Sequence, residues 1–341
     1  MRNIKDITIE KAIIHIIDST MEEPILNSRE LYLNEDTLEF IGKHIAKASS
    51  DEEAKYAVFN GENNIKEMCR RIIYESDAFI DVSKEIANIV FNQTKANGLI
   101  PSGDLIVVKF NCEYGRMLAI MKMIYNKTYI HSIDYVEDEM IIDIKPQFIG
   151  LPDTMQKLQK CALINFEDEY EALIVNRPTR QEKDAKTLNT FSDEIMKCSL
   201  VDDKRDHTKT FAVNTEKWVR ENLKEDAGKA EEFRREITSV LKNNDVIDIK
   251  EVATTIIPDE ELAQNFVETI KDSGINKEKI EVDREWVEKK LKRKKLKIDK
   301  DMEIYINSEA YNDINRFQIK KNGDGTIDII IRQVRNYFEK Q

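Results

Sequence analysis

A run of basic residues near the C-terminal end is the most concentrated chemical feature of the sequence. Seven of the nine residues from 289 to 297 are lysine or arginine, in a chain whose formal net charge is −12. The segment 277–300 holds eleven basic and six acidic residues, so it carries +5 and the rest of the chain carries −17. Such segregation predicts an anionic partner. The predicted phosphate-binding residues are Lys289, Lys290, Lys292, Arg293, Lys294, Lys295 and Lys297.

The same run has a purely structural interpretation, which stays open at this point. On a helix, Val287, Leu291 and Ile298 could face inward while the lysines project into water. Binding is favoured because so many adjacent cations repel one another unless phosphates or acidic groups lie nearby. There is little aromatic interleaving beyond Trp286, which favours contact with duplex phosphate over stacking on single-stranded bases. Weaker candidates for the same surface are Lys320, Lys321, Arg332 and Arg335.

A second cluster could support metal chemistry. Three carboxylates and one imidazole lie within six residues, a donor set that could hold a divalent metal as in a nuclease. Lys204 and Arg205 lie among these groups and can neutralise them, so metal binding is the less favoured interpretation. The nuclease hypothesis would use Asp202, Asp203, Asp206 and His207.

A glycine-rich turn near the C-terminal end superficially resembles a calcium loop. If Gly325 took the place of the invariant loop glycine, Lys320 and Ile331 would stand at the first and twelfth ligand positions. A cation and an isoleucine cannot replace the carboxylates that calcium requires there. The segment Asn322-Gly-Asp-Gly325 is therefore predicted to be a hairpin turn.

Other patterns of catalytic and metal sites do not occur in the sequence. There is no GxxxxGK[ST] phosphate loop, no GxSxG elbow, no HExxH and no GxGxxG after a strand. His15 lies in an apolar segment and is expected to be a hydrogen-bonded core residue rather than a general base. The four cysteines are too far apart for a zinc or redox motif, which predicts reduced, mostly buried thiols. We expect neither an enzyme nor a bound cofactor or metal.

The elements that must position the basic run predict an α+β fold. Nearly continuous apolar runs at 105–110 and 117–125 predict a hairpin of central strands that are buried on both faces. Helical spacing of apolar residues at 36–48 and 65–91 predicts helices that cover this sheet. The expected core is an antiparallel-rich sheet with helical cover. Further strands are predicted at 7–17, 140–144, 163–166 and 170–175.

After residue 178 the apolar period changes to that of helices, and a strand pattern returns from Met302. We therefore expect a helical domain followed by a small C-terminal α/β unit. The predicted division is 1–178 for the N-terminal α+β domain, 179–275 for the helical domain, and 276–341 for the basic segment with the small unit. The first residues predict neither a secretory signal nor a transmembrane helix, so the expected location is cytoplasmic, without a membrane partner.

Short segments in consistent order, from near residue 4 to near residue 335, carry a resemblance to a known family. They are Ile9-Glu-Lys-Ala-Ile-Ile-His-Ile-Ile-Asp18, Pro24-Ile-Leu-Asn-Ser28, Ser102-Gly-Asp-Leu-Ile-Val-Val108, Phe191 to Cys198, Glu281-Val-Asp-Arg284, Ile304-Tyr-Ile-Asn307 and Asn315-Arg316-Phe317. Each segment alone is a weak signal, whereas the ordered set is more specific. The set resembles the nucleoid-associated protein family of the NdpA type.

The resemblance implies a bacterial cytoplasmic protein that associates with the nucleoid and binds DNA as a homodimer, with no catalytic role. It brings no defined DNA-reading motif, so no site residues are carried over from the family. The leading hypothesis is sequence-tolerant binding of double-stranded DNA by phosphate contacts from the basic run. Because the remainder of the chain is acidic and repels DNA, an alternative is a protein-interaction subunit of a nucleoid or phage-defence assembly. A metal-dependent nuclease ranks last.

Overall fold

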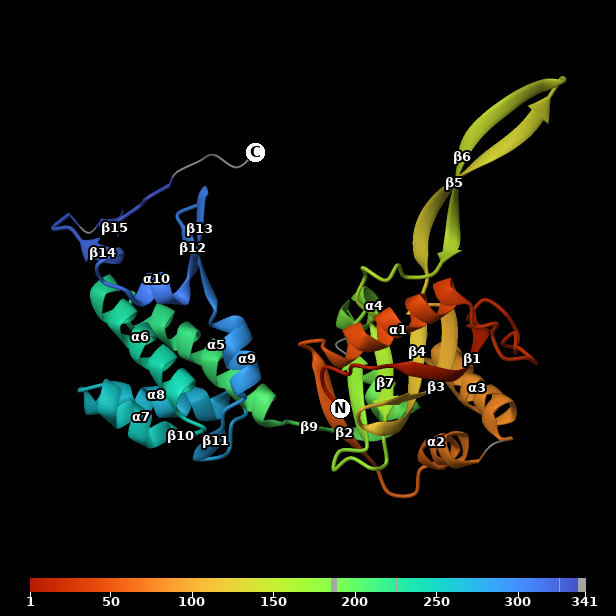
Figure 1. The fold of residues 1–341 in the computed structure, drawn as a ribbon, viewed down its shortest axis with the longest axis horizontal. Coiled ribbons are helices and arrows are strands. Elements are labelled where there is room, and N and C mark those ends of the chain that lie inside the picture. Colours follow the sequence, from red (N-terminus) through yellow and green to blue (C-terminus); the bar gives the residue numbers. More distant parts are fainter. Residues whose placement is uncertain (76, 185–188, 225, 325, 337–341) are drawn as a thin grey trace. The chain divides into compact units, whose positions relative to one another are not determined.

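The computed structural model describes residues 1–75, 77–184, 189–224, 226–324 and 326–336 (Figure 1). The chain forms two compact units, Met1–Val201 and Asp202–Gln341. The expected α+β class is confirmed, with a large antiparallel sheet in the first unit, helices in both units and small hairpins toward the C-terminal end. The finer division at residues 178 and 275 stays a prediction.

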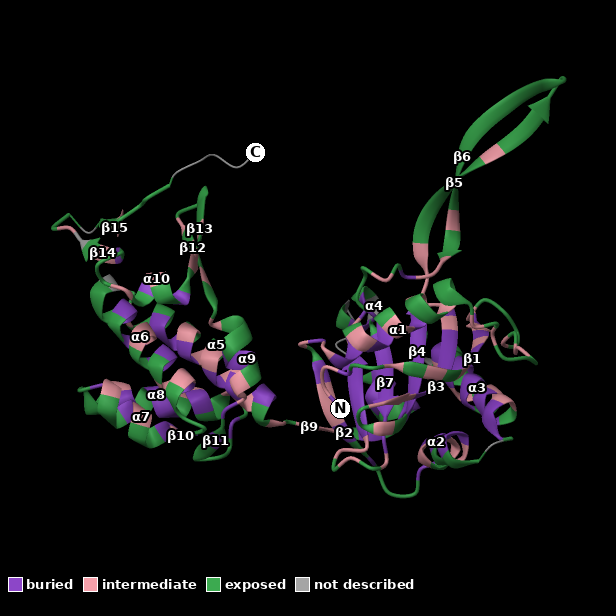
Figure 2. Cartoon of the chain, in the orientation of Figure 1, coloured by how far each residue is buried: buried purple, intermediate pink, exposed green. Residues whose placement is uncertain are grey.

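The first unit is built on a seven-stranded antiparallel sheet in the order β1-β3-β4-β7-β8-β2-β9. The predicted central hairpin is present as β3 and β4, and its residues from Met117 to Met123 are all buried (Figure 2). Continuous burial follows from continuous apolar sequence, because both faces of these strands are covered. The strands are β1 (Thr8–Ile17), β2 (Ala54–Phe59), β3 (Gly103–Cys112), β4 (Gly115–Ile124), β7 (Lys160–Ile164), β8 (Ala172–Asn176) and β9 (Cys198–Val201).

Helices cover both faces of this sheet. On one face α1 (Glu35–Ser49) packs over alternate β3 residues such as Ile106 and Val108. On the other face α2 (Asn64–Tyr74) and α3 (Phe79–Asn97) pack over Leu105 and Val107. The helical pattern at 65–91 is therefore two helices that share one apolar cluster. Two short helical segments follow β8, namely α4 (Arg180–Asp184) and the π-helix η1 (Phe191–Ile195).

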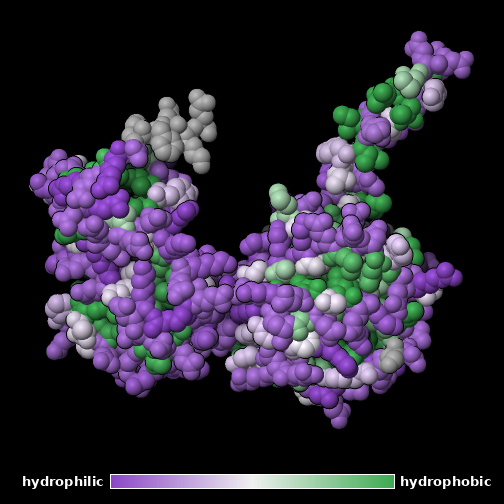
Figure 3. Space-filling model, viewed as in Figure 1, coloured by the Kyte–Doolittle hydropathy of each residue, from purple (hydrophilic) through white to green (hydrophobic). Residues whose placement is uncertain are grey.

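A long hairpin of β5 (Asn126–Val136) and β6 (Glu139–Gly150) is inserted between the paired strands β4 and β7. It forms a two-stranded sheet of its own and projects from the first unit (Figure 1). The predicted strand at 140–144 belongs to β6. Its apolar side chains are exposed, and hydrophobic residues colour much of the hairpin in Figure 3. The apolar sequence at 140–144 therefore predicts a strand correctly, but the strand is not part of the buried core.

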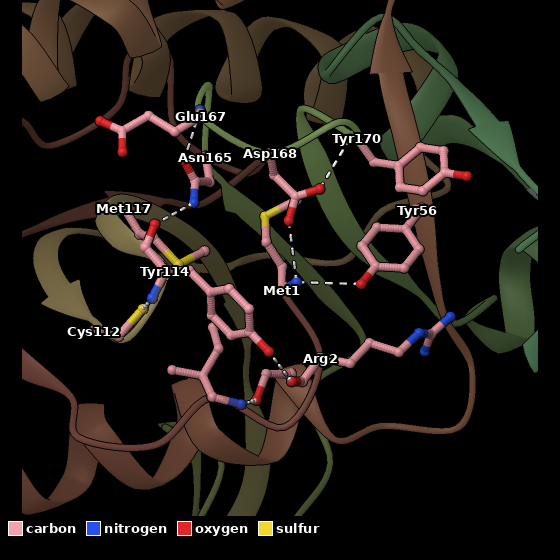
Figure 4. A network of polar contacts seen from close by, with 12 residues as sticks. Met1, Arg2, Tyr56, Cys112, Tyr114, Met117, Asn165, Glu167, Asp168 and Tyr170 are labelled. Atoms are coloured by element: carbon pink, nitrogen blue, oxygen red, sulfur yellow. Dashed lines mark hydrogen bonds and ion pairs between the residues drawn. The ribbon is translucent and has the colours of Figure 1, made fainter. Parts of the chain in front are cut away.

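The first residues of the chain are tied to the large sheet by polar contacts (Figure 4). The Met1 ammonium group lies 3.3 Å from the Asp168 carboxylate and donates to the Tyr56 hydroxyl at 3.2 Å. The Tyr114 hydroxyl donates to the carbonyl oxygen of Arg2 at 3.0 Å. The contacts join the start of the chain to β2 and to the turns that follow β3 and β7.

The second unit packs five helices around an aromatic cluster. Trp218 and Phe233 lie 5.2 Å apart between ring centres, and both contact Phe266. Two small strands, β10 (Val246–Asp248) and β11 (Lys279–Glu281), pair with each other. Among the described residues of both units, we find no helix whose length and apolarity would let it cross a bilayer. The helices are α5 (Lys204–Asn222), α6 (Ala227–Asn243), α7 (Ile249–Ile256), α8 (Glu260–Asp272) and α9 (Arg284–Lys290).

Two hairpins and one short helix complete the second unit. The first hairpin pairs β12 (Arg293–Ile298) with β13 (Met302–Asn307), and the second pairs β14 (Phe317–Lys321) with β15 (Ile327–Ile331). Between them α10 (Ser308–Asn312) packs against β12, β13 and β14. This is the strand-rich segment that the sequence predicts after Met302.

Candidate nucleic-acid interface

The basic run does not form one helix, so the interpretation of the run as a helix with an inward apolar side is wrong. Helix α9 ends at Lys290, and the amide of Leu291 caps it by donating to the carbonyl of Val287. Strand β12 then begins at Arg293 and hydrogen-bonds along β13. The residues from Arg293 to Ile298 alternate between exposed and half-buried, which is the period of a strand rather than of a helix. Pairing with β13, the next strand in the sequence, decides this conformation.

One face of the β12–β13 hairpin carries most of the positive charge of β12. Arg293, Lys295 and Lys297 are all exposed on it, because alternate residues of a strand share a face. The register places Tyr305 of β13 directly opposite Lys295. The Lys295 ammonium lies 2.9 Å from the Glu303 carboxylate and 5.4 Å from the centre of the Tyr305 ring. We call these residues, Arg293, Lys295, Lys297, Glu303 and Tyr305, the cationic face.

Lys294 lies on the opposite face and is only partly exposed. Its ammonium group sits 3.8 Å from the centre of the Tyr311 ring. Burial lowers the pKa of Lys294 to about 8, while the nearby Glu231 carboxylate raises it and the Arg234 guanidinium lowers it. Lys294 is thus placed to stabilise the second unit, although the sequence grouped it with the phosphate-binding candidates.

The aromatic residue of the cationic face was missed by sequence reasoning. Trp286 is buried, and its amide is bonded to the Asp283 side chain that caps α9. Tyr305, in contrast, is 65% exposed. A hairpin typically consists of two alternating segments separated by a few residues. The segments 293–298 and 302–307 fit this pattern, so the sequence could have predicted that Tyr305 pairs with Lys295.

The other candidate cations occupy several elements of the second unit. Lys289, Lys290 and Lys292 are exposed at the end of α9 and in the turn that follows it. Lys320 is exposed on β14 opposite Asp328, and Arg332 and Arg335 are exposed after β15. The side chain of Lys321 lies outside the described residues. Because α10 contacts both hairpins, β12 and β14 belong to one packed region.

The acidic cluster at the start of the second unit has a structural role. Asp203 is the N-cap of α5, and its carboxylate accepts from the amide of Asp206 at 2.9 Å. The Asp206 carboxylate accepts from the amide of Asp203 at 3.3 Å. This reciprocal capping box stabilises a helix start. Within the described ranges, no three histidine, cysteine or acidic residues are arranged to hold a metal ion.

The predicted hairpin and the predicted core residues are found as expected. Strand β14 pairs with β15, and the Asp324 carboxylate accepts from the amide of Thr326 at 3.0 Å, while Gly325 of the predicted turn lies outside the described residues. His15 is buried, accepts from the amide of Asn27 at 3.1 Å and contacts the Ser83 hydroxyl at 3.0 Å. All four cysteines are free, and three of them are buried.

A cavity of about 610 Å³ in the first unit has a partly cationic wall. Lys55, Lys157, Arg177 and Lys183 line it together with Glu53. The Arg177 guanidinium pairs with the buried carboxylate of Asp51, and the Lys157 ammonium lies 3.9 Å from it. Part of this positive charge is thus already compensated, which makes the cavity a weaker candidate for phosphate than the cationic face.

Two comparisons with known proteins bear on the expected family. A search of curated proteins finds no match to the chain, whereas a family model matches it. The family model described as nucleoid-associated protein YejK, a name equivalent to NdpA, matches residues 13–339. This range covers nearly the whole chain, including the basic run, and the family is named for nucleoid association rather than for a catalytic activity. The chain belongs to the nucleoid-associated protein YejK family.

Proposed function

We propose that the chain binds double-stranded DNA of the nucleoid through phosphate contacts from the exposed cations of the second unit. The observation that carries the proposal is the cationic face, where Arg293, Lys295 and Lys297 project from one side of β12. Alternate residues on a strand recur about every 6.8 Å, which is twice the axial spacing of phosphates on one DNA strand. The membership in a nucleoid-associated family supports the same conclusion.

The charge distribution sets the expected mode of binding. Contacts to phosphate fix position without reading sequence, so we expect little sequence preference. The acidic remainder of the chain repels DNA, which would confine binding to the basic region. Affinity should therefore depend steeply on salt.

A triple variant tests this proposal. We expect Arg293→Gln/Lys295→Gln/Lys297→Gln to weaken binding to a fluorescent duplex, measured by anisotropy over a salt series. The slope of log affinity against log salt should become shallower by about 0.9 for each phosphate that the variant no longer neutralises. The matched control, Lys217→Gln/Lys224→Gln/Lys271→Gln, removes the same charge from exposed positions elsewhere in the second unit.

The two variants together decide the role of the cationic face. If the triple variant keeps the wild-type slope, the cationic face does not bind phosphate. An equal loss in both variants would instead indicate that net charge alone governs binding. Cleavage of the duplex in the presence of magnesium would revive the nuclease hypothesis.

We further propose that the chain acts as a homodimer, which would present two cationic faces to one duplex and raise the avidity. A second candidate function, a subunit of a protein assembly, is favoured by the exposed apolar hairpin of β5 and β6. Purification with and without nuclease separates the two functions. Partners that stay bound after the DNA is destroyed would support the assembly.

A further inference from the structure

The β5–β6 hairpin is amphipathic across its two faces. In an antiparallel pair, residues opposite each other point to the same face. The register pairs His131 with Ile144 and Ile133 with Ile142. Following this alternation along both strands gives one face with no acidic residue, which we call the apolar face. Its members are Tyr129, His131, Ile133, Tyr135, Met140, Ile142, Ile144, Pro146 and Phe148.

The opposite face of the hairpin is mixed, with charged groups beside the exposed Ile130, Val136 and Ile141. It pairs Ser132 with Asp143 and Val136 with Glu139. The Lys145 ammonium lies 2.8 Å from the Asp134 carboxylate across the strands. The acidic groups of the two strands lie on this face, whereas the apolar face carries the Lys127 ammonium only at its base, over the rings of Tyr129 and Phe148. The two faces therefore have different preferred surroundings.

The apolar face is open to solvent in the single chain. Tyr135 is 72% exposed and Ile144 is 70% exposed, and hydrophobic residues along the hairpin are visible in Figure 3. A two-stranded hairpin without a covered face is marginally stable in water. Contiguous exposed apolar patches of several hundred Å² mark interaction sites. The hairpin therefore requires a partner to cover it.

We infer that the apolar face packs against the same face of a second copy of this chain. Its large exposed side chains offer on the order of 700 Å² per copy, close to the roughly 800 Å² per partner of a stable interface. The face is also self-complementary. Its middle carries Ile133, Ile142 and Ile144, and aromatic rings lie toward both ends, so an antiparallel two-fold pairing sets isoleucine on isoleucine.

This inference deepens the proposed homodimer and does not depend on the DNA contacts. In the two-fold arrangement Tyr135, near the tip of one hairpin, meets Tyr129, near the base of the other. The polar faces stay in water on the outside of the paired sheets. The first unit of each copy would lie at an opposite end of the paired hairpins.

Neighbouring isoleucines on opposite faces provide a matched test. Ile142→Lys places an ammonium group in the centre of the proposed interface, whereas Ile141→Lys adds the same charge beside Asp134 on the polar face. Sedimentation equilibrium of the full chain should show dimers for the wild type and for Ile141→Lys. The dissociation constant of Ile142→Lys should rise by at least about 100-fold, because the buried charge has no partner. Circular dichroism and thermal unfolding confirm that both variants fold.

Cysteine cross-linking tests the antiparallel arrangement directly. A mixture of Tyr129→Cys and Tyr135→Cys chains should form a disulfide-linked species of doubled mass under mild oxidation. Each variant alone should form much less of this species. Efficient cross-linking of Tyr135→Cys alone would overturn the antiparallel arrangement.

The remaining outcomes separate this inference from the proposed function. A wild-type chain that stays monomeric at about 100 μM, on the order of the weakest specific dimers, would overturn the pairing. An Ile142→Lys variant that dimerises like the wild type would overturn the apolar face as the interface. Monomeric wild type that binds phosphatidylglycerol vesicles, with binding lost in Ile142→Lys, would assign the face to lipid instead. The proposed DNA contacts are tested separately. An unchanged salt slope in the triple variant would overturn them without bearing on the dimer.

Discussion

The Lys294 ammonium lies 3.8 Å from the centre of the Tyr311 ring, on the face of β12 opposite Arg293, Lys295 and Lys297. Tyr311 is buried and stacks on Phe317, with 4.9 Å between the ring centres. Strand alternation thereby divides these basic residues. Lys294 packs against Tyr311 inside the second unit, whereas its neighbours on β12 face solvent. The division gives the run two separable physical roles.

Substitution of Lys294 should affect stability but not the salt dependence of DNA binding. Lys294→Gln removes the cation–π contact with Tyr311, which we expect to lower the free energy of unfolding by about 1 kcal/mol. Lys295→Gln should leave stability nearly unchanged, since its pair with Glu303 is exposed, yet it should make the salt slope shallower by about 0.9. Urea denaturation and anisotropy measure the two effects. A shallower slope in Lys294→Gln would contradict this division.

Protonation of His15 should destabilise the first unit in acid. Burial, with a smaller effect of Lys84, lowers the pKa of His15 to about 4 from an ordinary value of 6.5. Between these values the unfolded chain binds a proton that the folded chain does not, so the free energy of unfolding falls as the pH falls from 6.5 to 4. The loss should reach about 3 kcal/mol.

Urea denaturation between about pH 4.5 and 7 measures this effect by comparing the wild type with His15→Gln. The wild type should have the steeper pH dependence, because glutamine does not titrate. The other buried histidine, His44, is present in both proteins and cancels in the comparison. Equal pH dependence in the two proteins would show that His15 is not the group responsible.

Breaking the buried ion pair between Lys160 and Glu182 should be costly. The Lys160 ammonium of β7 lies 2.8 Å from both carboxylate oxygens of Glu182, and both side chains are fully buried. Glu182→Gln leaves a buried charge without its partner and should cost about 3–5 kcal/mol. The double variant Lys160→Met/Glu182→Gln should lose less than the sum of the single variants Lys160→Met and Glu182→Gln. Additive losses in a double-mutant cycle would contradict a direct coupling.

Two glycines should respond to alanine in opposite ways. A Cβ at Gly103 would lie 2.8 Å from the Ile124 Cα and closer still to the Met123 carbonyl oxygen, so Gly103→Ala should cost about 1–3 kcal/mol or more. A Cβ at Gly42, in α1, meets nothing within 4 Å. Gly42→Ala should therefore gain about 0.5–1 kcal/mol. Thermal unfolding of the two variants provides the comparison, and a stabilised Gly103→Ala would show that β4 can move away.

The central sheet was predictable because its signal is local. The apolar runs at 105–110 and 117–125 are long enough to require burial on both faces, and the structure places them in β3 and β4. The strand at 140–144 has a similar apolar content, yet its residues are exposed in β6. Hydrophobicity predicts that a surface will be covered, but it does not say by which chain.

The candidate site was predictable in composition but not in geometry. The charge count identified an anion-binding segment, and the segments that resemble a nucleoid-associated family gave its context. The pairing of Lys295 with Tyr305 across β12 and β13 could not be read from the charge count. Nor could the burial of Trp286 and the position of Lys294 over Tyr311.

The sequence by itself determined the fold class, the central strands and the segregation of charge, because these depend on residue types over short windows. Tertiary structure alone decided which cations face solvent and which hairpin is left uncovered. The reason is that strand pairing fixes side-chain direction through the register between two strands, which a count of residue types does not contain. A shift of one residue in that register would send Lys294 outward and Lys295 inward.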